Sequence, residues 1–275
     1  MVDRDVALEG LSALCNATVT SVQQRTSRGV HYIKPEQLNT KTFVHSVLVG
    51  EASCPVSGTI FHSINTGVRP GCLFKLDLDT DGSKTGKIYI IDEEEFFDPK
   101  YHYDFTNVTD SQTFYRGGEK YERPCGWQRF AIKVLDQYGE NTWLGNTNRS
   151  TQSVAGEWPV SYHGTSQGGA EGIIKRRYEP GPGAVYGYGV YSTPDLSVAN
   201  GYAKSFTSQK TGKTYKVILQ NRINPEHREK CNHDKYWLVP VKAGASDKEQ
   251  QELVERAIRP YGLLLKEETN ECIIL

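Results

Sequence analysis

Three short segments determine how the second half of the chain should be read. They are Tyr162-His163-Gly164-Thr165, then Gly187-Tyr188-Gly189-Val190-Tyr191-Ser192, then Ala199-Asn200-Gly201-Tyr202-Ala203. The first ends a β-rich run and the second contains one, so residues 158–162 and 189–192 are predicted strands. A short helix is predicted between them at residues 167–176. Thr193 then offers a capping hydroxyl and Pro194 a preset φ for the first turn, which predicts a helix over residues 195–205.

Strands and helices continue to alternate on the C-terminal side of these segments. Residues 214–220, 236–239 and 261–266 have the texture of strands. Ser246, with Glu249 three residues later, makes a capping box that opens a helix over residues 247–257.

The first half of the chain has a different texture. Residues 6–24 have the apolar spacing of a helix, whereas residues 42–98 break into short β-rich runs at 43–49, 59–62, 72–78 and 87–91. The whole pattern predicts an α+β protein with a boundary near residue 115. Residues 1–115 are then a smaller helix-plus-sheet region of unknown role, and residues 116–275 form a second domain.

The composition excludes several classes of protein. The 275 residues carry 32 basic and 33 acidic side chains, a net charge of -1, so the basic excess of a duplex-DNA-binding protein is missing. No apolar run is long enough to span a bilayer, and the first residues lack the pattern of a signal peptide, so neither membrane association nor secretion is expected. Six scattered cysteines without paired spacing indicate reduced thiols. These features together predict an intracellular protein, cytoplasmic or nuclear.

Two patterns resemble metal sites only in part. Asp77-x-Asp79-x-Asp81-Gly82 imitates the front of a calcium loop, but the twelfth position falls on Ile88, where calcium requires a glutamate. A hairpin turn at Asp81-Gly82 is the better interpretation. Cys231-x-His233 has no second ligand pair to complete a zinc site. No metal is therefore predicted.

The ordered set of three segments resembles the NAD-binding core of the poly(ADP-ribose) polymerase-like ADP-ribosyltransferases. The resemblance covers about residues 155–266 and depends on the order strand-His-Gly-Thr, helix, Gly-x-Gly-Val-Tyr strand, and helix ending in Tyr-Ala. It implies a split β-sandwich with flanking short helices and NAD as the substrate. Cleavage of NAD passes through an oxocarbenium-like transition state, so such an enzyme must grip the leaving nicotinamide and hold the ribose.

The resemblance also implies roles for individual residues. The backbone of Gly164 is expected to hold the nicotinamide amide, His163 to bind the adenosine-ribose hydroxyl, and Thr165 to add a polar contact. Tyr191 and Tyr202 are expected to sandwich the nicotinamide ring, a role that aromatic faces perform well. His163 and Tyr191 are thereby assigned to the catalytic centre. The other donor-site residues implied, in the loop 178–187 and after it, are Tyr178, Tyr186, Gly189 and Ala199.

Two positions depart from the family pattern. Ala199 stands where members often have a serine that holds the nicotinamide amide. The strand at 236–239 puts Lys235 where polymerising members carry a catalytic glutamate, and a register one residue earlier would put Asp234 there. A charged lysine cannot accept a hydrogen bond from the ribose hydroxyl, and it repels an oxocarbenium cation. The resemblance therefore implies mono-ADP-ribosylation and not chain polymerisation.

Three functions are compatible with these residues. The first is mono-ADP-ribosyl transfer to a protein, which includes the chain itself, with a nucleic-acid end as a less favoured acceptor. The second is a catalytically silent module of the same fold that binds NAD, ADP-ribose or a protein. Lys235 and Ala199 favour this second function, whereas the intact His163, Tyr191 and Tyr202 oppose it. The third is RNA 2′-phosphotransfer, which the near-neutral charge and sparse arginines disfavour.

Overall fold

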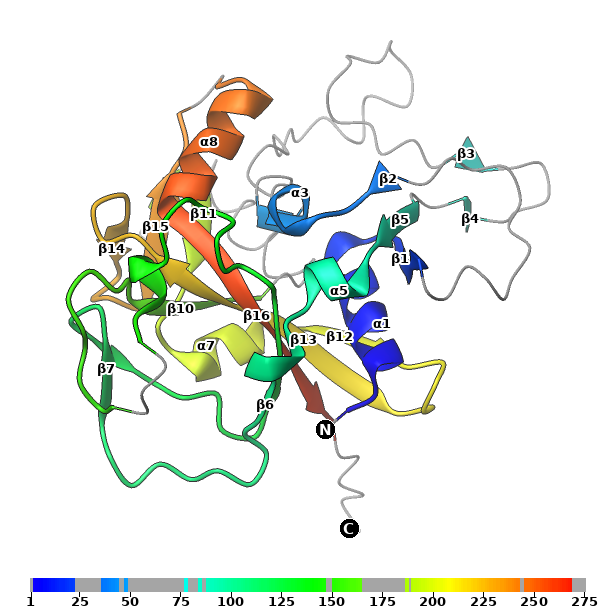
Figure 1. Cartoon of the computed structure of the whole chain (residues 1–275), viewed down its shortest axis with the longest axis horizontal. Helices are drawn as coiled ribbons and strands as arrows, with labels where there is room; N and C mark the ends of the chain where they lie inside the picture. Colours follow the sequence, from blue (N-terminus) through cyan, green and yellow to red (C-terminus); the bar gives the residue numbers. More distant parts are fainter. Residues whose placement is uncertain are drawn as a thin grey trace, which may run out of the picture.

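Short helices and antiparallel sheets together make this an α+β protein, as the sequence predicts (Figure 1). The structure is a computed structural model. It describes residues 2–22, 36–44, 47–48, 77–78, 84–85, 88–146, 150–164, 186–187, 189–242 and 245–268.

A six-stranded antiparallel sheet occupies the centre of the molecule. Its strands run in the order β10-β13-β16-β9-β6, and β12 also pairs with β13. Their bounds are β6 (Tyr103–Asp104), β9 (Gln128–Ala131), β10 (Val160–His163), β12 (Lys204–Thr207), β13 (Thr214–Ile223) and β16 (Ile258–Glu267). The strands predicted at 158–162, 214–220 and 261–266 are confirmed. The last two are longer than predicted because β13 and β16 stay paired as far as Ile223 and Ile258, which are both fully buried.

A second, three-stranded antiparallel sheet lies beside the first. Its order is β11-β15-β14, with β11 (Gly189–Ser192), β14 (Glu229–Cys231) and β15 (Tyr236–Pro240). Tyr162 of β10 and Thr193, which follows β11, exchange two backbone hydrogen bonds of 2.7 and 2.9 Å. These bonds join the end of β11 to the edge strand of the central sheet. The strands predicted at 189–192 and 236–239 are confirmed.

The helix after β11 begins later than the sequence suggests. The carboxylate of Asp195, and not the hydroxyl of Thr193, caps α7 (Leu196–Gly201), because it accepts the backbone N–H groups of Ser197 and Val198. The predicted end at residue 205 is also wrong, since β12 begins at Lys204.

The capping box at Ser246 is confirmed. The hydroxyl of Ser246 accepts the N–H of Glu249, and the Glu249 carboxylate accepts the N–H of Ser246, at the start of α8 (Asp247–Ala257).

The N-terminal elements differ from two predictions. α1 (Arg4–Cys15) ends where Asn16 takes a left-handed conformation (φ 48°), and β1 (Thr18–Ser21) follows, so the prediction of a helix as far as residue 24 is wrong. Residues 43–49 were a predicted strand, but α3 (Thr40–Val44) covers the beginning of that range. The side chain of Asn39 accepts the N–H groups of Lys41 and Thr42 and so caps this helix, which outweighs the β propensity of the sequence.

The remaining elements are short. β2 (Glu36–Gln37) and β1 lie parallel to β5 (Ile88–Ile91) on either side of it, and β5 confirms the predicted strand at 87–91. The antiparallel pairing of β3 (Asp77–Leu78) with β4 (Lys84–Thr85) agrees with a hairpin, whose turn lies outside the described residues. The others are α5 (Glu93–Phe96), η2 (Pro99–Tyr101), β7 (Phe114–Arg116), β8 (Glu119–Tyr121) and η3 (Thr142–Leu144). The predictions at 59–62, most of 72–78 and 167–176 also lie outside the described residues.

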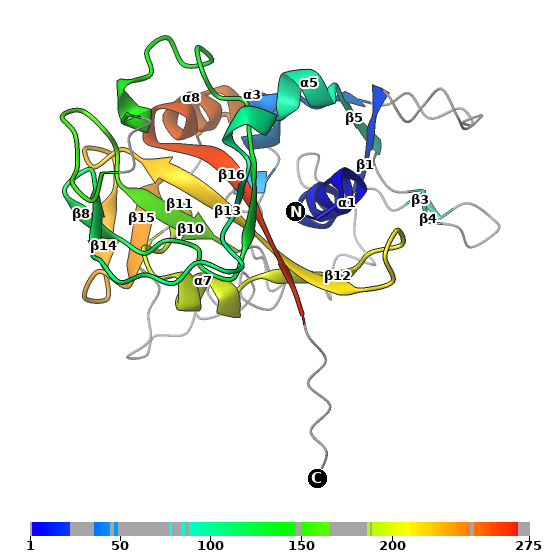
Figure 2. The same ribbon diagram turned by 60° about the horizontal axis from the view of Figure 1, so that its bottom comes forward.

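One hydrophobic cluster joins the N-terminal elements to the central sheet. Val6 and Leu11 of α1 are fully buried in the same cluster as Val217 of β13 and Leu265 of β16. Figure 2 shows α1 beside β12 and β16, and α1 also packs against β13. β6, which precedes residue 115, also pairs with β9, which follows it. Packing therefore runs across the boundary near residue 115, and the division into 1–115 and 116–275 stays a prediction.

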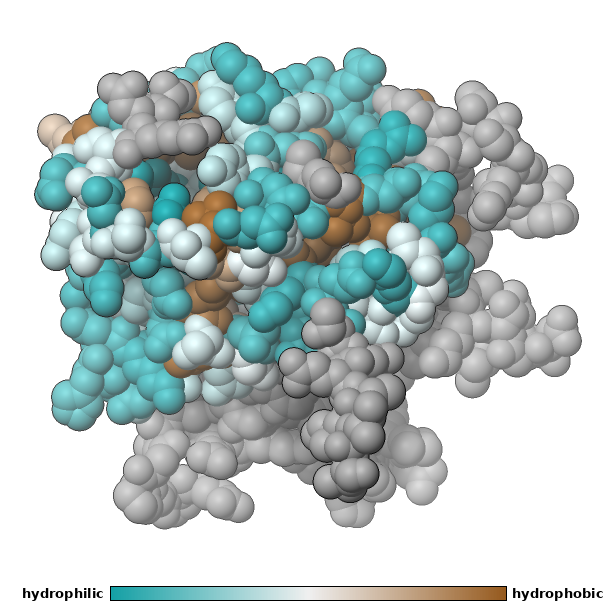
Figure 3. Space-filling model, turned by 90° about the horizontal axis from the view of Figure 1, so that it is seen from below, coloured by the Kyte–Doolittle hydropathy of each residue, from teal (hydrophilic) through white to brown (hydrophobic). Residues whose placement is uncertain are grey.

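Among the described residues on the surface seen from below, hydrophilic side chains predominate, and a band of apolar residues crosses the middle (Figure 3). None of the helices in the described ranges has the length and apolar character that crossing a membrane requires.

Candidate functional site

His163 and Tyr191 meet where β10 and β11 lie next to each other. The His163 side chain is only 6% exposed, and its Nδ1 atom lies 2.6 Å from the backbone oxygen of Tyr191. A carbonyl oxygen can only accept a hydrogen bond, so Nδ1 carries the proton and donates it. In the neutral ring Nε2 is then an acceptor, which suits the binding of a hydroxyl group.

Gly164 brings the end of β10 directly against the C-terminal end of α7. A Cβ atom at this position would lie 2.5 Å from the carbonyl oxygen of Tyr202 and 2.8 Å from that of Ala199. No side chain fits against backbone at these distances, so only glycine permits this packing. The first and third sequence segments are therefore in contact through their backbones. Ala199 itself is 1% exposed.

Gly189 lets β11 lie close to β15. A Cβ atom here would be 2.1 Å from the carbonyl oxygen of Val239. The second segment also folds back on itself, because the hydroxyl of Tyr191 donates a 2.6 Å hydrogen bond to the carbonyl of Gly187. This bond holds the phenol ring beside the backbone that enters β11.

Tyr236 connects the aromatic residues of the site, a role not predicted from the sequence. Its hydroxyl lies 3.3 Å from that of Tyr202, and its ring centroid lies 6.3 Å from the ring of Tyr186 at an interplanar angle of 33°. Tyr191 pairs with Leu238 across β11 and β15, so its side chain shares a face of this sheet with that of Tyr236. The sequence does hold one indication of this role. Tyr236 lies two residues before Leu238 in a predicted strand, and side chains two residues apart in a strand lie on the same face of the sheet.

Lys235 and Asp234 occupy the hairpin loop between β14 and β15. Asn232, His233 and Asp234 all have left-handed backbone conformations, with φ of 51°, 52° and 66°. The carboxylate of Asp234 is 57% exposed and pairs with Lys230 at 3.2 Å, on the β14 side of the loop.

The backbone oxygen of Lys235 accepts a 2.7 Å hydrogen bond from the hydroxyl of Thr193, which fixes the head of β15 to the start of α7. Its ammonium group lies 5.8 Å from the ring centroid of Tyr236. Lys235 therefore lies beside Tyr236, whereas Asp234 is directed to Lys230.

The carboxylate of Asp195 supplies a negative charge near Lys235. Burial raises the pKa of Asp195, but the hydrogen bonds from Ser197 and Val198, together with the Lys235 cation, hold the pKa below its usual value. Asp195 therefore stays ionised and offsets part of the lysine charge.

Glu122 is a second residue of the site that was not predicted from the sequence. Its carboxylate accepts the N–H of Leu196 at 2.9 Å, and its backbone oxygen accepts a hydrogen bond from the hydroxyl of Tyr162. Complete burial raises the pKa of Tyr162 well above its usual value, so the phenol keeps its proton and remains a donor. Glu122 thus holds both β10 and α7 in place. Because it lies 40 residues from Tyr162 and 74 from Leu196 in the sequence, no local sequence pattern could predict these contacts.

The structure brings together His163, Gly164, Tyr186, Gly189, Tyr191, Ala199, Tyr202 and Lys235 around α7, β11 and β15. Asp234 is directed to Lys230. Thr165 and Tyr178 lie outside the described residues. In the part of the chain that the structure describes, no three His, Cys, Asp or Glu side chains gather closely enough to hold a metal ion. No model of a known protein family and no curated protein matches this chain.

Proposed function

We propose that this protein is an NAD-dependent mono-ADP-ribosyltransferase that transfers ADP-ribose to a protein and releases nicotinamide. The proposal includes the split β-sandwich of the poly(ADP-ribose) polymerase-like family for residues 116–275 and an intracellular location. One observation carries it. Three segments spread over 42 residues, which resemble the family in order and composition, are joined by the contact of His163 with Tyr191 and of Gly164 with Tyr202.

The chemistry of these side chains fits the cleavage of NAD. The bond between ribose C1′ and the nicotinamide nitrogen breaks, and its electron pair leaves with the nicotinamide, which becomes neutral. A nucleophile of the acceptor protein forms the new bond to C1′ and gives up its proton. His163 Nε2 suits a ribose hydroxyl, the backbone of Gly164 suits the nicotinamide amide, and the rings of Tyr191 and Tyr202 suit the flat leaving group.

Lys235 limits the reaction to a single transfer. Its ammonium group, close to the Tyr236 ring, cannot accept the hydrogen bond with which a glutamate would activate a hydroxyl for chain growth. The same cation favours the second candidate function, a silent module that binds NAD or ADP-ribose, because it opposes the developing positive charge on the ribose. Asp195 nearby reduces this repulsion, which supports the enzyme over the silent module.

The variant His163→Asn tests the site. An asparagine amide can reach the position of Nδ1 and keep the donor to the Tyr191 carbonyl, but it removes Nε2. We expect the release of nicotinamide from NAD to fall roughly tenfold or more, because a hydrogen bond to the ribose is lost in the transition state. The matched control is His227→Asn, in the loop before β14, which should leave the rate unchanged.

The outcomes separate the two candidates. Nicotinamide release by the wild type that His163→Asn does not reduce would contradict the site assignment. Binding of NAD by the wild type without any release of nicotinamide would identify the silent module.

A further inference from the structure

The described part of the chain contains a large cavity on the opposite face of the central sheet from His163. In the pairing of β10 with β13, Val160 lies opposite Arg222 and His163 lies opposite Leu219. Side chains alternate between the faces of a sheet, so Val160 and Arg222 share one face and His163 points to the other. The cavity has a volume of about 520 Å³, and both Val160 and Arg222 line it. The central sheet therefore separates the cavity from the site described above.

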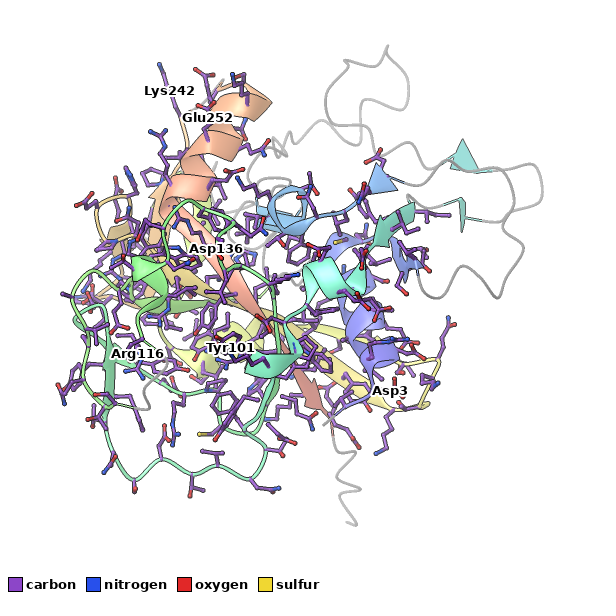
Figure 4. The ribbon with its side chains drawn as sticks, viewed as in Figure 1. Asp3, Tyr101, Arg116, Asp136, Lys242 and Glu252 are labelled. Carbon is purple, nitrogen blue, oxygen red and sulfur yellow. The ribbon has the colours of Figure 1, made fainter. Side chains whose placement is uncertain are left out.

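Part of the wall of this cavity is aromatic. Six aromatic rings contribute to it: Tyr101, Tyr103, Phe105, Phe114, Tyr121 and Tyr261. Figure 4 labels Tyr101 of η2 and Arg116 of β7, two lining residues that come from separate elements. Burial raises the pKa of Tyr261, so its phenol stays neutral. Flat ring faces of this kind accept another planar ring at low cost.

The charged residues that line the cavity leave an excess of positive charge. Arg123 is paired with Asp110, and Arg222 is paired with Glu157 at 3.6 Å. The other charged lining residues are Lys100, Arg116 and Arg129, with Asp98 as the single acid. None of these four makes an ion pair within the described residues, so the cavity carries two positive charges in excess.

Arg129 is held in place without a counter-ion. Its guanidinium donates a 3.1 Å hydrogen bond to the backbone oxygen of Tyr101. The guanidinium carbon also lies 5.6 Å from the ring centroid of Phe105 and 5.8 Å from that of Tyr261. Its Nε atom is buried and has no hydrogen-bond partner in the described part of the chain. A buried donor and an uncompensated charge both cost free energy, which an anionic ligand would recover.

Arg116 is held on the cavity wall in a similar way. It donates to the backbone oxygen of Ser150 at 3.0 Å, and its guanidinium lies 5.5 Å from the ring centroid of Tyr121. The two arginines are thus fixed by neutral backbone oxygens and aromatic faces, so their charge remains available to an anion.

We propose that this cavity binds a nucleoside monophosphate. The phosphate group, with nearly two negative charges at neutral pH, matches the excess of two positive charges and pairs with Arg129 and Arg116. The base stacks on the aromatic part of the wall. The cavity volume lies within the range of roughly 300–1,000 Å³ that small-molecule sites have. This binding site is separate from the proposed NAD site.

The test is calorimetric titration with AMP of the full chain carrying His163→Asn, in which the proposed NAD site is weakened. Into this background we introduce Arg129→Gln, Arg116→Gln or, as a matched control on α8, Arg256→Gln. We expect AMP to bind, and each of the first two changes to weaken its binding roughly tenfold, because a charge-assisted contact is lost. Arg256→Gln should leave binding unchanged, and inorganic phosphate alone should bind more weakly than AMP.

Three results would overturn the proposal. They are no heat of binding with AMP, AMP binding that neither arginine change weakens, and phosphate binding as tight as that of AMP. Because the background variant already lacks the His163 ring, none of these results depends on whether the protein cleaves NAD.

Discussion

At the scale of single residues, two glycines determine whether the proposed site can assemble. Gly189 lies under the Val239 carbonyl and Gly164 lies under the Tyr202 carbonyl, each at a distance that excludes a Cβ atom. In both cases the neighbour is backbone, which cannot move aside as a flexible side chain does. The close approach of β11 to β15 and of β10 to α7 therefore depends on the absence of a side chain.

Gly189→Ala should destabilise the protein by about 2 kcal/mol or more, because the new methyl group would lie 2.1 Å from the Val239 oxygen. Gly201→Ala is the control, since a Cβ atom there meets nothing within 4 Å. This control should be neutral or stabilising by up to about 1 kcal/mol. Urea unfolding curves of the two variants give both values. Equal stability of Gly189→Ala and the wild type would show that β11 does not lie against β15 as described.

The sequence predicts most residues of the candidate site but not their contacts. His163, Gly164, Tyr191 and Tyr202 could be found because each belongs to a short local pattern. Tyr236 and Glu122 could not, because their contacts with Tyr202 and Leu196 come from strand pairing and loop packing across long stretches of chain. The ion pair of Asp234 with Lys230 is likewise a contact that no sequence register reveals, and the choice between Lys235 and Asp234 stays a prediction.

At the scale of secondary-structure elements, local capping determines where the helices begin. α8 begins at the predicted residue because both halves of its capping box form. α3 replaces a predicted strand because the Asn39 side chain caps it, and α7 begins late because Asp195 is a better cap than Thr193. Strands were predicted well where apolar runs are long, and their extra length in β13 and β16 comes from pairing that spacing alone does not show.

Ser246→Ala should destabilise the protein by about 1 kcal/mol, because the N–H of Glu249 loses its acceptor. Ser246→Thr keeps the hydroxyl and should restore most of the loss. The midpoints of chemical unfolding of the two variants check this expectation. If alanine and threonine had the same effect, the capping hydrogen bond would not contribute to stability.

At the scale of the whole molecule, the central sheet carries a different candidate site on each face. The cavity on the face opposite His163 is lined by residues of η2, β6, β7, β8, β9, η3, β10, β13 and β16, together with residues of the segments between them. Its cations are dispersed through the sequence among balancing acids, so the net charge of -1 gives no sign of it. A site of this kind can be identified only from the folded structure, which shows which charged side chains form ion pairs and which do not.

Acid should destabilise the folded protein partly through His102, which also lines the cavity. Burial lowers the pKa of His102, and the Arg129 cation lowers it further against the opposing effect of Asp98. Its Nδ1 atom accepts the N–H of Ala131 at 3.0 Å, a bond that protonation would break. The folded state favours the neutral ring, so this contribution is present above the unfolded pKa of about 6.5 and is lost as the pH falls through the lower folded value.

His102→Asn supplies a non-titrating acceptor at the position of Nδ1. Thermal unfolding of both proteins between about pH 7.5 and pH 5 should show a smaller loss of stability on acidification in the variant than in the wild type. Identical pH profiles would mean that His102 does not contribute.

The proposed transferase function depends on NAD cleavage, and the most direct measurement is to incubate the purified wild-type protein with NAD. Intact-mass spectrometry and quantitation of free nicotinamide are then performed on the same sample. We predict the release of nicotinamide together with protein whose mass has increased by single ADP-ribose units, without longer chains. Unchanged protein mass with no nicotinamide released, even after an acceptor protein mixture is added, would contradict the proposed enzyme.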